Sequence, residues 1–268
     1  MEESVGVDSP GRGASRSAAG DDRPPRRRTS IIGVIGEILI TLGVITLLYV
    51  VWQLWVGDLI YGAERNATGS EISQEWAQEY SATPSPTPTP TADDTDPVTA
   101  EPVILAEPAD TELFGVMYIP RFGADYHVPM AGGVTRSGTL DPIGIGHYPG
   151  TKMPGEVGNF AVAAHRTTYG KPFNRIAELQ VGDAIVVETE VGWYTYRFRT
   201  LEYVQPDQVE VLLPVPQAPD VPPGTRYLTM TSCSPMYSLA ERIVAYSVFE
   251  SFTPRSAGAP PAMTDVEA

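Results

Sequence analysis

The chain has 268 residues and a formal net charge of −15 at pH 7, with 18 Lys and Arg against 33 Asp and Glu. This balance disfavours a nucleic-acid partner, because contacts to phosphates need a basic face. Cys233 is the single cysteine, so no disulfide within the chain holds the fold, and the length allows one ordinary domain with appendages.

Residues 1–30 are predicted to be a disordered tail, because they are rich in Ser, Gly, Asp and Arg and contain few large apolar side chains. The segment 31–56 is apolar apart from Glu37 and Gln53. As a helix it would be roughly 39 Å long at about 1.5 Å per residue, whereas the hydrocarbon core of a bilayer is about 30 Å thick. We therefore predict a transmembrane anchor over residues 31–57.

The residues that flank this anchor predict its orientation. An Arg cluster at 23–28 precedes it, and basic residues beside a span mark the cytoplasmic side. Trp52 and Trp55 lie near the other end, where interfacial aromatic side chains are common. A cleavable signal peptide has an apolar core of only about 7–15 residues. We therefore predict a retained, single-pass plasma-membrane anchor with a cytoplasmic N-terminus and an extracytoplasmic remainder.

Residues 58–103 are predicted to be a polar segment followed by a spacer. A short polar helix is expected over residues 61–80, and the run SATPSPTPTPT at 81–91 alternates Pro with small hydroxyl residues. Such a run cannot pack a core and is typical of extended, semi-rigid linkers.

The folded domain is predicted over residues 104–254 and is mainly β. Short runs rich in β-branched and aromatic residues are separated by turn residues, which is typical of an antiparallel barrel or sandwich. The best helical candidate is short, at residues 173–180, and residues 255–268 are predicted to be a disordered tail. The expected strands are 113–120, 159–165, 184–190, 193–205, 226–233 and 242–249.

Three reactive side chains lie at the ends of predicted strands. Cys233 ends one strand, and Ser234-Pro235 follows it directly. The next strand begins near Arg242 after a short connection, so the two strands are expected to be antiparallel neighbours with Cys233 and Arg242 at one edge of the sheet. His165 also ends an apolar strand, just before a turn. A strand end holds a nucleophile firmly and leaves it open to substrate.

These residue types suit nucleophilic catalysis. Cysteine reacts as the thiolate, which a cationic neighbour favours, histidine exchanges protons near neutral pH, and arginine offers fixed donors to a developing oxyanion. Each residue alone also has a structural explanation, since a free Cys is commonly buried and inert and a strand-end His or Arg is commonly solvated. Their conjunction predicts an active site at Cys233, His165 and Arg242. No metal-ligand cluster or phosphate-binding glycine loop is present in the sequence, so no metal and no cofactor are predicted.

The sequence around these residues resembles the sortase family. The run LTMTSC at 228–233, followed by Arg242, resembles the TLxTC…R element of sortases, with Met230 in place of the usual Leu and Ser232 in place of the usual Thr. The likeness covers about residues 104–252. Three further motifs are similar to class E sortases of actinobacteria: HYPGT at 147–151, PGEVGN at 154–159 and HRTTYG at 165–170.

This resemblance implies a closed eight-stranded β-barrel with short helices and a cysteine transpeptidase activity. The enzyme would cleave a C-terminal sorting motif, LAxTG or LPxTG, between Thr and Gly, and Cys233 would form a thioester with the Thr carbonyl. An amine of a peptidoglycan precursor or cross-bridge would then take the acyl group and so attach a surface protein to the cell wall. His165 would act as general acid and then base, and Arg242 would bind the substrate and the oxyanion.

Substrate-binding residues are implied by the same resemblance, namely Tyr148, Thr167, Thr231 and Ser232. A Tyr placed like Tyr148 is associated in class E with a preference for LAxTG over LPxTG. A loop aromatic that only packs against its neighbours is the alternative explanation of Tyr148.

Two alternatives remain open at this point. A pilus-type sortase joins protein subunits through Lys, but such enzymes often carry an Asp-Pro-aromatic lid and a second membrane span, whereas here Val98 follows Asp96-Pro97 and the tail is polar. A catalytically silent, membrane-tethered binding module would explain the anchor, spacer and barrel, but not the three strand-end residues. An L,D-transpeptidase is disfavoured, because Thr231-Ser232 precedes Cys233 in place of His and Gly.

Overall fold

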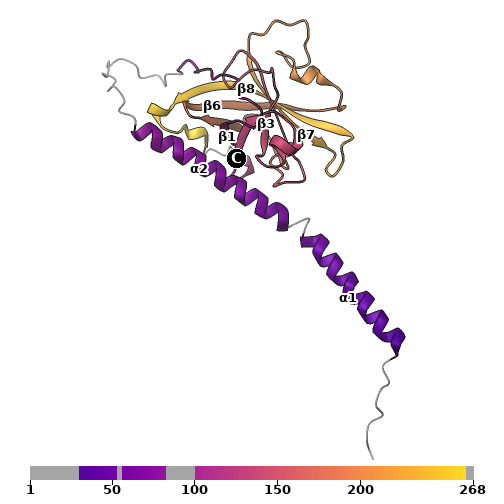
Figure 1. The fold of residues 1–268 in the computed structure, drawn as a ribbon. Coiled ribbons are helices and arrows are strands. Elements are labelled where there is room, and N and C mark those ends of the chain that lie inside the picture. Colours follow the sequence, from indigo (N-terminus) through magenta and orange to yellow (C-terminus); the bar gives the residue numbers. More distant parts are fainter. Residues whose placement is uncertain (1–29, 53–55, 83–99, 264–268) are drawn as a thin grey trace, which may run out of the picture. The chain divides into compact units, whose positions relative to one another are not determined.

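The computed structural model of the chain describes residues 30–52, 56–82 and 100–263 (Figure 1). The chain divides into two compact units between Leu48 and Tyr49. Residues 1–29 of the predicted tail and most of the Pro-rich run at 81–91 lie outside the described residues. The domain boundaries given above therefore stay predictions.

The segment predicted as an anchor forms helix α1 (Ile31–Val51), with no buried side chains. Of the helices in the described ranges, it is the one long and apolar enough to cross a membrane. The regular helix ends at Val51, before the predicted end at residue 57. The structure therefore contains, within residues 31–57, a helix of the length and composition that a membrane span requires.

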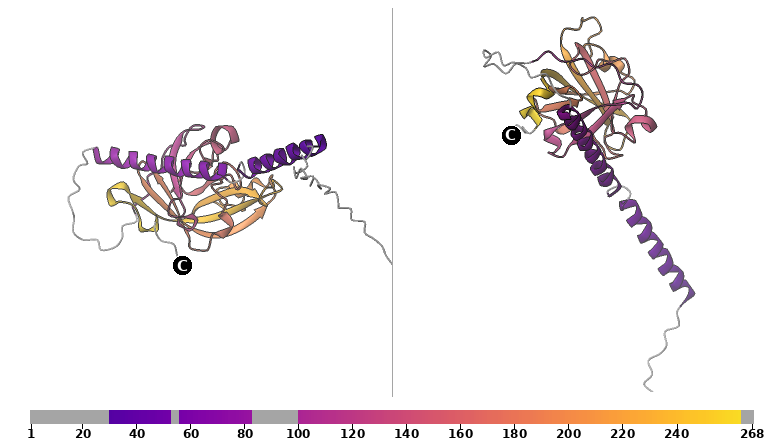
Figure 2. Two further views of the ribbon diagram at one scale, coloured as in Figure 1. Left: turned by 90° about the horizontal axis from the view of Figure 1, so that it is seen from below. Right: turned by 60° about the vertical axis from the view of Figure 1, so that its left-hand side comes forward.

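The remainder of the chain is built on a closed barrel of eight strands, which confirms the mainly β fold. The strand order around the barrel is β1-β2-β3-β4-β7-β8-β6-β5. Figure 2 shows the barrel from two further sides, and Figure 1 labels the long strands β6 and β8, which pair with each other. Their bounds are β1 (Leu113–Tyr118), β2 (His127–Gly132), β3 (Ile145–His147), β4 (Gly158–Ala164), β5 (Ala184–Thr189), β6 (Gly192–Val204), β7 (Arg226–Ser234) and β8 (Glu241–Pro254).

The expectation of a purely antiparallel sheet is wrong at two places. β2 pairs in parallel with β3, and β4 pairs in parallel with β7. The second pair arises because β5 and β6 form between β4 and β7 in the sequence but lie elsewhere in the barrel. β2 and β3 were not predicted, since Pro129 interrupts the β2 pattern and β3 has only three residues.

The barrel interior is filled by aromatic and aliphatic side chains from several strands. Phe160, Tyr194, Tyr196 and Leu228 are fully buried in this core. The buried hydroxyl of Tyr196 accepts a hydrogen bond from the backbone N–H of Gly155 at 2.8 Å. The Tyr196 hydroxyl therefore has a hydrogen-bond partner inside the core.

Helix α2 (Gly57–Ala82) extends beyond the polar helix predicted at 61–80 and packs on β2. Its Gly69 is buried, and a Cβ there would meet the carbonyl oxygen of His127 at 1.9 Å. A larger residue would therefore push the helix away from the barrel. Ile72 and Trp76 of α2 pack against the apolar cluster on the outer face of β1 and β5.

Two segments differ from the sequence-based expectation. The predicted helix at 173–180 contains only the 3₁₀ turn η4 (Ile176–Glu178). The residues after β8, predicted as a disordered tail, form the 3₁₀ turns η6 (Arg255–Ala257) and η7 (Pro261–Met263). This part of the tail is ordered because Arg255 and Ala262 are buried against the barrel. Residues 264–268 lie outside the described residues.

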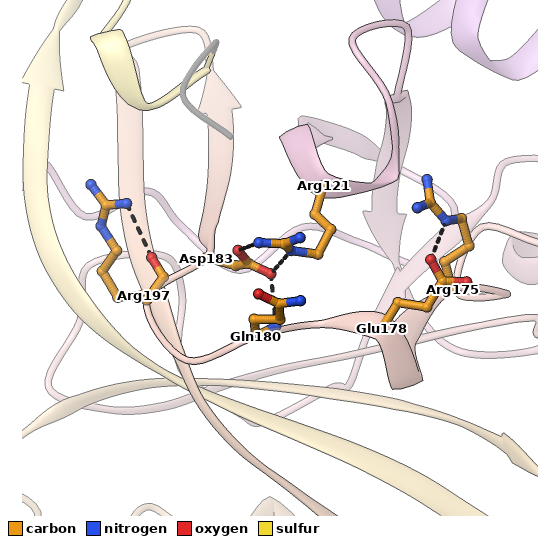
Figure 3. Close-up of polar contacts among 7 residues, drawn as sticks. Arg121, Arg175, Glu178, Gln180, Asp183 and Arg197 are labelled. Carbon is orange, nitrogen blue, oxygen red and sulfur yellow. Dashed lines mark hydrogen bonds and ion pairs between the residues drawn. The ribbon is translucent and has the colours of Figure 1, made fainter. Parts of the chain in front are cut away.

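Polar contacts fasten the 3₁₀ turn η2 (Pro120–Phe122) to the start of β5 (Figure 3). The carboxylate of Asp183 accepts hydrogen bonds from Arg121, one of them from Nη2 at 2.7 Å, and another from the backbone N–H of Gln180 at 2.7 Å. Asp183 is only 5% exposed, so its charge is compensated by these donors rather than by water. The contact lies just beyond the paired residues of β1 and β5 and joins the turn after β1 to the residue before β5.

Candidate active site

The strand directions bring the three predicted catalytic residues to the same end of the barrel. β7 and β8 are antiparallel, with Cys233 directly opposite Arg242. β4 and β7 are parallel, with Ala163 opposite Thr231. His165 is two residues beyond Ala163, so continuation of this register places it level with Cys233.

All seven residues predicted for catalysis and substrate binding line one cleft at this end of the barrel. Its volume is ≈ 550 Å³. The predicted residues in its wall are Tyr148, His165, Thr167, Thr231, Ser232, Cys233 and Arg242, and they are joined by Val134, Arg136, Leu140, Ala163, Ala164, Arg166, Thr168, Tyr237, Ser238 and Leu239. A cleft of this size, with mixed apolar and polar walls, accommodates a short peptide.

The thiol of Cys233 is free and partly exposed. Two hydrogen bonds fix the strand end that carries it. Arg166 donates through Nη1 to the carbonyl oxygen of Cys233 at 3.3 Å, and Ser232 donates through Oγ to the carbonyl oxygen of Ala164 at 2.8 Å. The Ser232 hydroxyl therefore ties the Cys233 strand to the residue just before His165. This backbone contact uses the hydrogen of the Ser232 hydroxyl.

The imidazole of His165 is held on two sides. Its Nε2 lies 2.6 Å from Oδ1 of Asp141, and its ring stacks on Tyr169 with the ring centres 5.4 Å apart. A carboxylate bonded to one ring nitrogen fixes the orientation and tautomer of a histidine. The other nitrogen, Nδ1, is then available for proton exchange.

The guanidinium of Arg242 is partly exposed and bonded to its own loop. Nη1 donates to the carbonyl oxygens of Leu239 at 3.2 Å and Glu241 at 2.9 Å. Within residues 30–52, 56–82 and 100–263, no carboxylate forms an ion pair with it. Nη2 and Nε can therefore donate to an anion in the cleft.

Tyr148 joins the wall of the cleft through a hydroxyl pair. Its OH lies 2.9 Å from Oγ1 of Thr231, whose hydroxyl also reaches the carbonyl oxygen of Val162 at 3.4 Å. Thr231 donates to that carbonyl and so accepts from Tyr148. Burial raises the pKa of Tyr148, which keeps the phenol neutral and able to donate at physiological pH.

The chain has three histidines, and the other two lie away from the cleft. His147 is buried, with Nε2 bonded to the carbonyl oxygen of Lys152 at 3.1 Å. His127 is bonded through Nδ1 to Ser70 of α2 at 2.6 Å. In the described part of the chain, no group of three or more His, Cys, Asp or Glu side chains is arranged to hold a metal ion.

Sequence reasoning missed several residues of the site. Asp141 gave no signal, because its contact with His165 depends on the loop before β3. Arg166 and Tyr169 stand in the HRTTYG motif that carried the resemblance, but nothing in the pattern indicates that one binds Cys233 and the other stacks on His165. Tyr237 is 86% exposed at the rim of the cleft.

The cleft of this eight-stranded barrel is lined by a free thiol, an imidazole and a guanidinium, which are the groups that thiol-based acyl transfer requires. The sortase domain model matches residues 117–250 of this chain. Sortase SrtE1 of Streptomyces coelicolor is 34% identical over 235 residues, which are 85% of this chain and 60% of SrtE1. SrtE2 of the same organism is 30% identical over 239 residues, 87% of each protein.

A solved structure gives the same result. Sortase E1 from Streptomyces coelicolor, with a tripeptide in the active site, has a TM-score of 0.53 and 35% identity, covering 58% of this chain and 99% of that one. The chain belongs to the sortase family of cysteine transpeptidases, in class E. It spans 60% of the length of SrtE1.

Proposed function

We propose that this protein cleaves a C-terminal sorting motif of the LAxTG or LPxTG kind between Thr and Gly and transfers the acyl product to an amine of peptidoglycan. The observation that carries this proposal is the single cleft that Cys233, His165 and Arg242 line together. The tripeptide in the active site of the sortase E1 relative supports a peptide substrate.

In the first half-reaction the Cys233 thiolate attacks the Thr carbonyl carbon. The carbonyl oxygen becomes an oxyanion, which the free guanidinium donors of Arg242 stabilise. The tetrahedral intermediate then collapses, the C–N bond to Gly breaks, and His165 gives a proton to the departing amine. The product is a thioester between Cys233 and the Thr acyl group.

In the second half-reaction an amine of a peptidoglycan precursor or cross-bridge attacks the thioester. His165, now lacking its proton, takes one from the attacking nitrogen, and Arg242 again stabilises the oxyanion. The C–S bond breaks and Cys233 leaves as a thiolate. One amide bond is thus exchanged for another, with no net consumption of water.

Tyr148, Thr167, Thr231 and Ser232 are proposed to contact the sorting motif. Tyr148 and Thr231 are the best placed, since their bonded hydroxyls stand together in the cleft wall. The side chains of Ala and Pro, which distinguish the two motifs, have no hydrogen-bonding group and differ in size, so a fixed hydroxyl pair would discriminate between them by shape. We assign to this pair the choice at the second position of the motif.

The proposed location follows from helix α1. The helix would anchor the protein in the plasma membrane by a single pass, with the Arg cluster at 23–28 on the cytoplasmic side and the barrel outside. The partners of the enzyme are then surface proteins that bear a C-terminal sorting motif, the peptidoglycan amine, and the bilayer itself.

The test is a peptide assay with purified protein. Peptides that contain LAxTG or LPxTG are incubated with and without an amine acceptor, and the products are identified by mass spectrometry. Cleavage between Thr and Gly is expected, with a conjugate when the amine is present, and both products disappear in Cys233→Ala and His165→Ala. Cleavage elsewhere in the peptides, or turnover that survives Cys233→Ala, would rule out the proposed reaction.

A further inference from the structure

One face of helix α2 lies against the segments that hold His165. Asp58 precedes Tyr61 by three residues and Gly62 by four, and Arg65 follows them by four and three, so the four residues lie on one side of the helix. Each contacts a residue of the loops that flank the cleft, and the reaction described above uses none of them. These contacts form two separate routes from α2 to the imidazole of His165.

The first route runs through Arg65 and Asp141. The Arg65 side chain is buried, with the residue 6% exposed, and its Nη2 donates to the backbone carbonyl of Asp141 and, at 3.4 Å, to that of Leu140. The carboxylate of Asp141 in turn binds Nε2 of His165 at 2.6 Å. α2 therefore holds the backbone of the residue whose side chain holds the imidazole.

The second route runs through two tyrosines. The ring of Tyr61 contacts that of Tyr169, with 6.0 Å between centres, and Tyr169 stacks on His165 at 5.4 Å. The backbones also touch, since a Cβ on Gly170 would lie 2.8 Å from the nitrogen of Gly62. Gly170 has φ +69°, so glycine permits both the turn and the close approach.

We propose that α2 positions the imidazole of His165 for proton transfer, and that Arg65 and Tyr61 are the residues through which it acts. The proposal rests on the proposed function, because it needs His165 as the acid and base of the reaction. Nε2 is held by Asp141, so Nδ1 exchanges the proton with the leaving and attacking amines. α2 begins at Gly57, close in sequence to the end of α1 at Val51, so the helix that follows the predicted anchor in the sequence becomes part of the catalytic apparatus.

The experiment uses the full chain in lipid nanodiscs, with kcat and KM for an LAxTG peptide and melting temperature measured for each variant. Arg65→Met and Tyr61→Leu remove the two routes, and Glu64→Gln is the control, because Glu64 lies on the exposed face of α2. Displacement of a catalytic group by about 1 Å can cost about 100-fold in rate. We expect kcat to fall by up to about this factor in Arg65→Met, with KM unchanged, partial recovery in Arg65→Lys, and normal kcat in Glu64→Gln.

A normal kcat in Arg65→Met, or a change confined to KM, would overturn the proposal. If Arg65→Met also lowers the melting temperature, Gly69→Val decides, because a side chain there would meet the carbonyl oxygen of His127 and displace α2, which disturbs both routes while Arg65 and Tyr61 themselves are unchanged. Loss of kcat at constant KM in Gly69→Val supports the proposal, and a normal kcat rejects it. Absence of turnover in both the wild type and Glu64→Gln would reject the proposed function and this inference together, whereas turnover in both with a normal Arg65→Met rejects the inference alone.

Discussion

Two arginines at the opposite ends of β8 have contrasting surroundings. Arg255, just after the strand, is buried, and its Nη2 donates to Glu188 at 2.9 Å and to the carbonyl oxygen of Thr189 at 2.6 Å. Its guanidinium also lies over the ring of Trp193 at 4.9 Å. Arg242, near the start of the strand, is partly exposed and bonds only to two carbonyls of its loop in the described part of the chain.

This contrast separates a structural guanidinium from one that can act on a substrate. The donors of Arg255 are used by a carboxylate and carbonyls in a closed site, so no ligand can reach them. The donors of Arg242 face a cleft that also holds the thiol of Cys233. The residue type and its place at a strand end are the same in both cases, and only the packing around each side chain decides its role.

The largest effect is expected from Arg255, at the buried end of β8, and it should be an effect on stability. Arg255→Met leaves the carboxylate of Glu188, which is 1% exposed, without its cationic partner. Breaking one half of a buried ion pair costs about 3–5 kcal/mol. Urea denaturation should report a loss of this size, while the exposed control Arg199→Met on β6 should unfold like the wild type. Equal stability of Arg255→Met and the control would show that the ion pair between Arg255 and Glu188 does not stabilise the barrel.

A substitution of Arg242, at the opposite end of β8, should lower the activity and leave the stability unchanged. Arg242→Lys keeps the charge but loses the planar set of donors, and removal of an oxyanion donor costs about 10²- to 10³-fold in rate. We expect a fall of this size in kcat/KM for a sorting peptide, with an unchanged urea midpoint. If Arg242→Lys turns over at a near-normal rate, the role assigned to Arg242 is wrong.

A smaller effect is expected from pH at His147. Burial lowers the pKa of His147 below its ordinary value, so as the pH falls the unfolded chain takes up a proton before the folded chain does. The free energy of unfolding should therefore decrease as the pH drops below about 6.5, by at most about 1.4 kcal/mol per pH unit, until the folded-state pKa is reached. In His147→Gln this contribution is absent. The free energies of unfolding from urea titrations at pH 7.5 and pH 5.5 should therefore differ less in this variant than in the wild type. An identical pH dependence of the two proteins would contradict the assignment.

The smallest effect is expected at the hydroxyl pair in the cleft wall. Tyr148→Phe removes the hydrogen bond to Thr231, which contributes about 1 kcal/mol or less to stability. The barrel should remain folded, and the ratio of kcat/KM values for LAxTG and LPxTG peptides should change by up to about tenfold. Tyr203→Phe, at a 55% exposed position, is the matched control. An unchanged ratio in Tyr148→Phe would remove this residue from motif recognition.

Several features of this protein could be predicted because they depend on local sequence. The alternation of β6 and β7, the apolar run of α1 and the placement of Cys233, His165 and Arg242 at strand ends all follow from patterns within a few residues. The parallel pairing of β4 with β7 and the contact of Asp141 with His165 could not, since they depend on segments that meet only after the barrel closes. The ordered 3₁₀ turn η6 could not be predicted for the same reason, because it depends on the burial of Arg255 against Glu188 of another strand.

The most direct test of the account is to capture the acyl-enzyme. The protein is mixed with an LAxTG peptide without an amine acceptor, quenched in acid, and analysed by intact mass and peptide mapping. We expect a mass increase equal to the peptide ending at Thr less one water, located on Cys233, released by hydroxylamine and absent from Cys233→Ala. An adduct on another residue, or turnover of the peptide with no thioester on Cys233 at any time, would contradict the central claim that this thiol carries the acyl group.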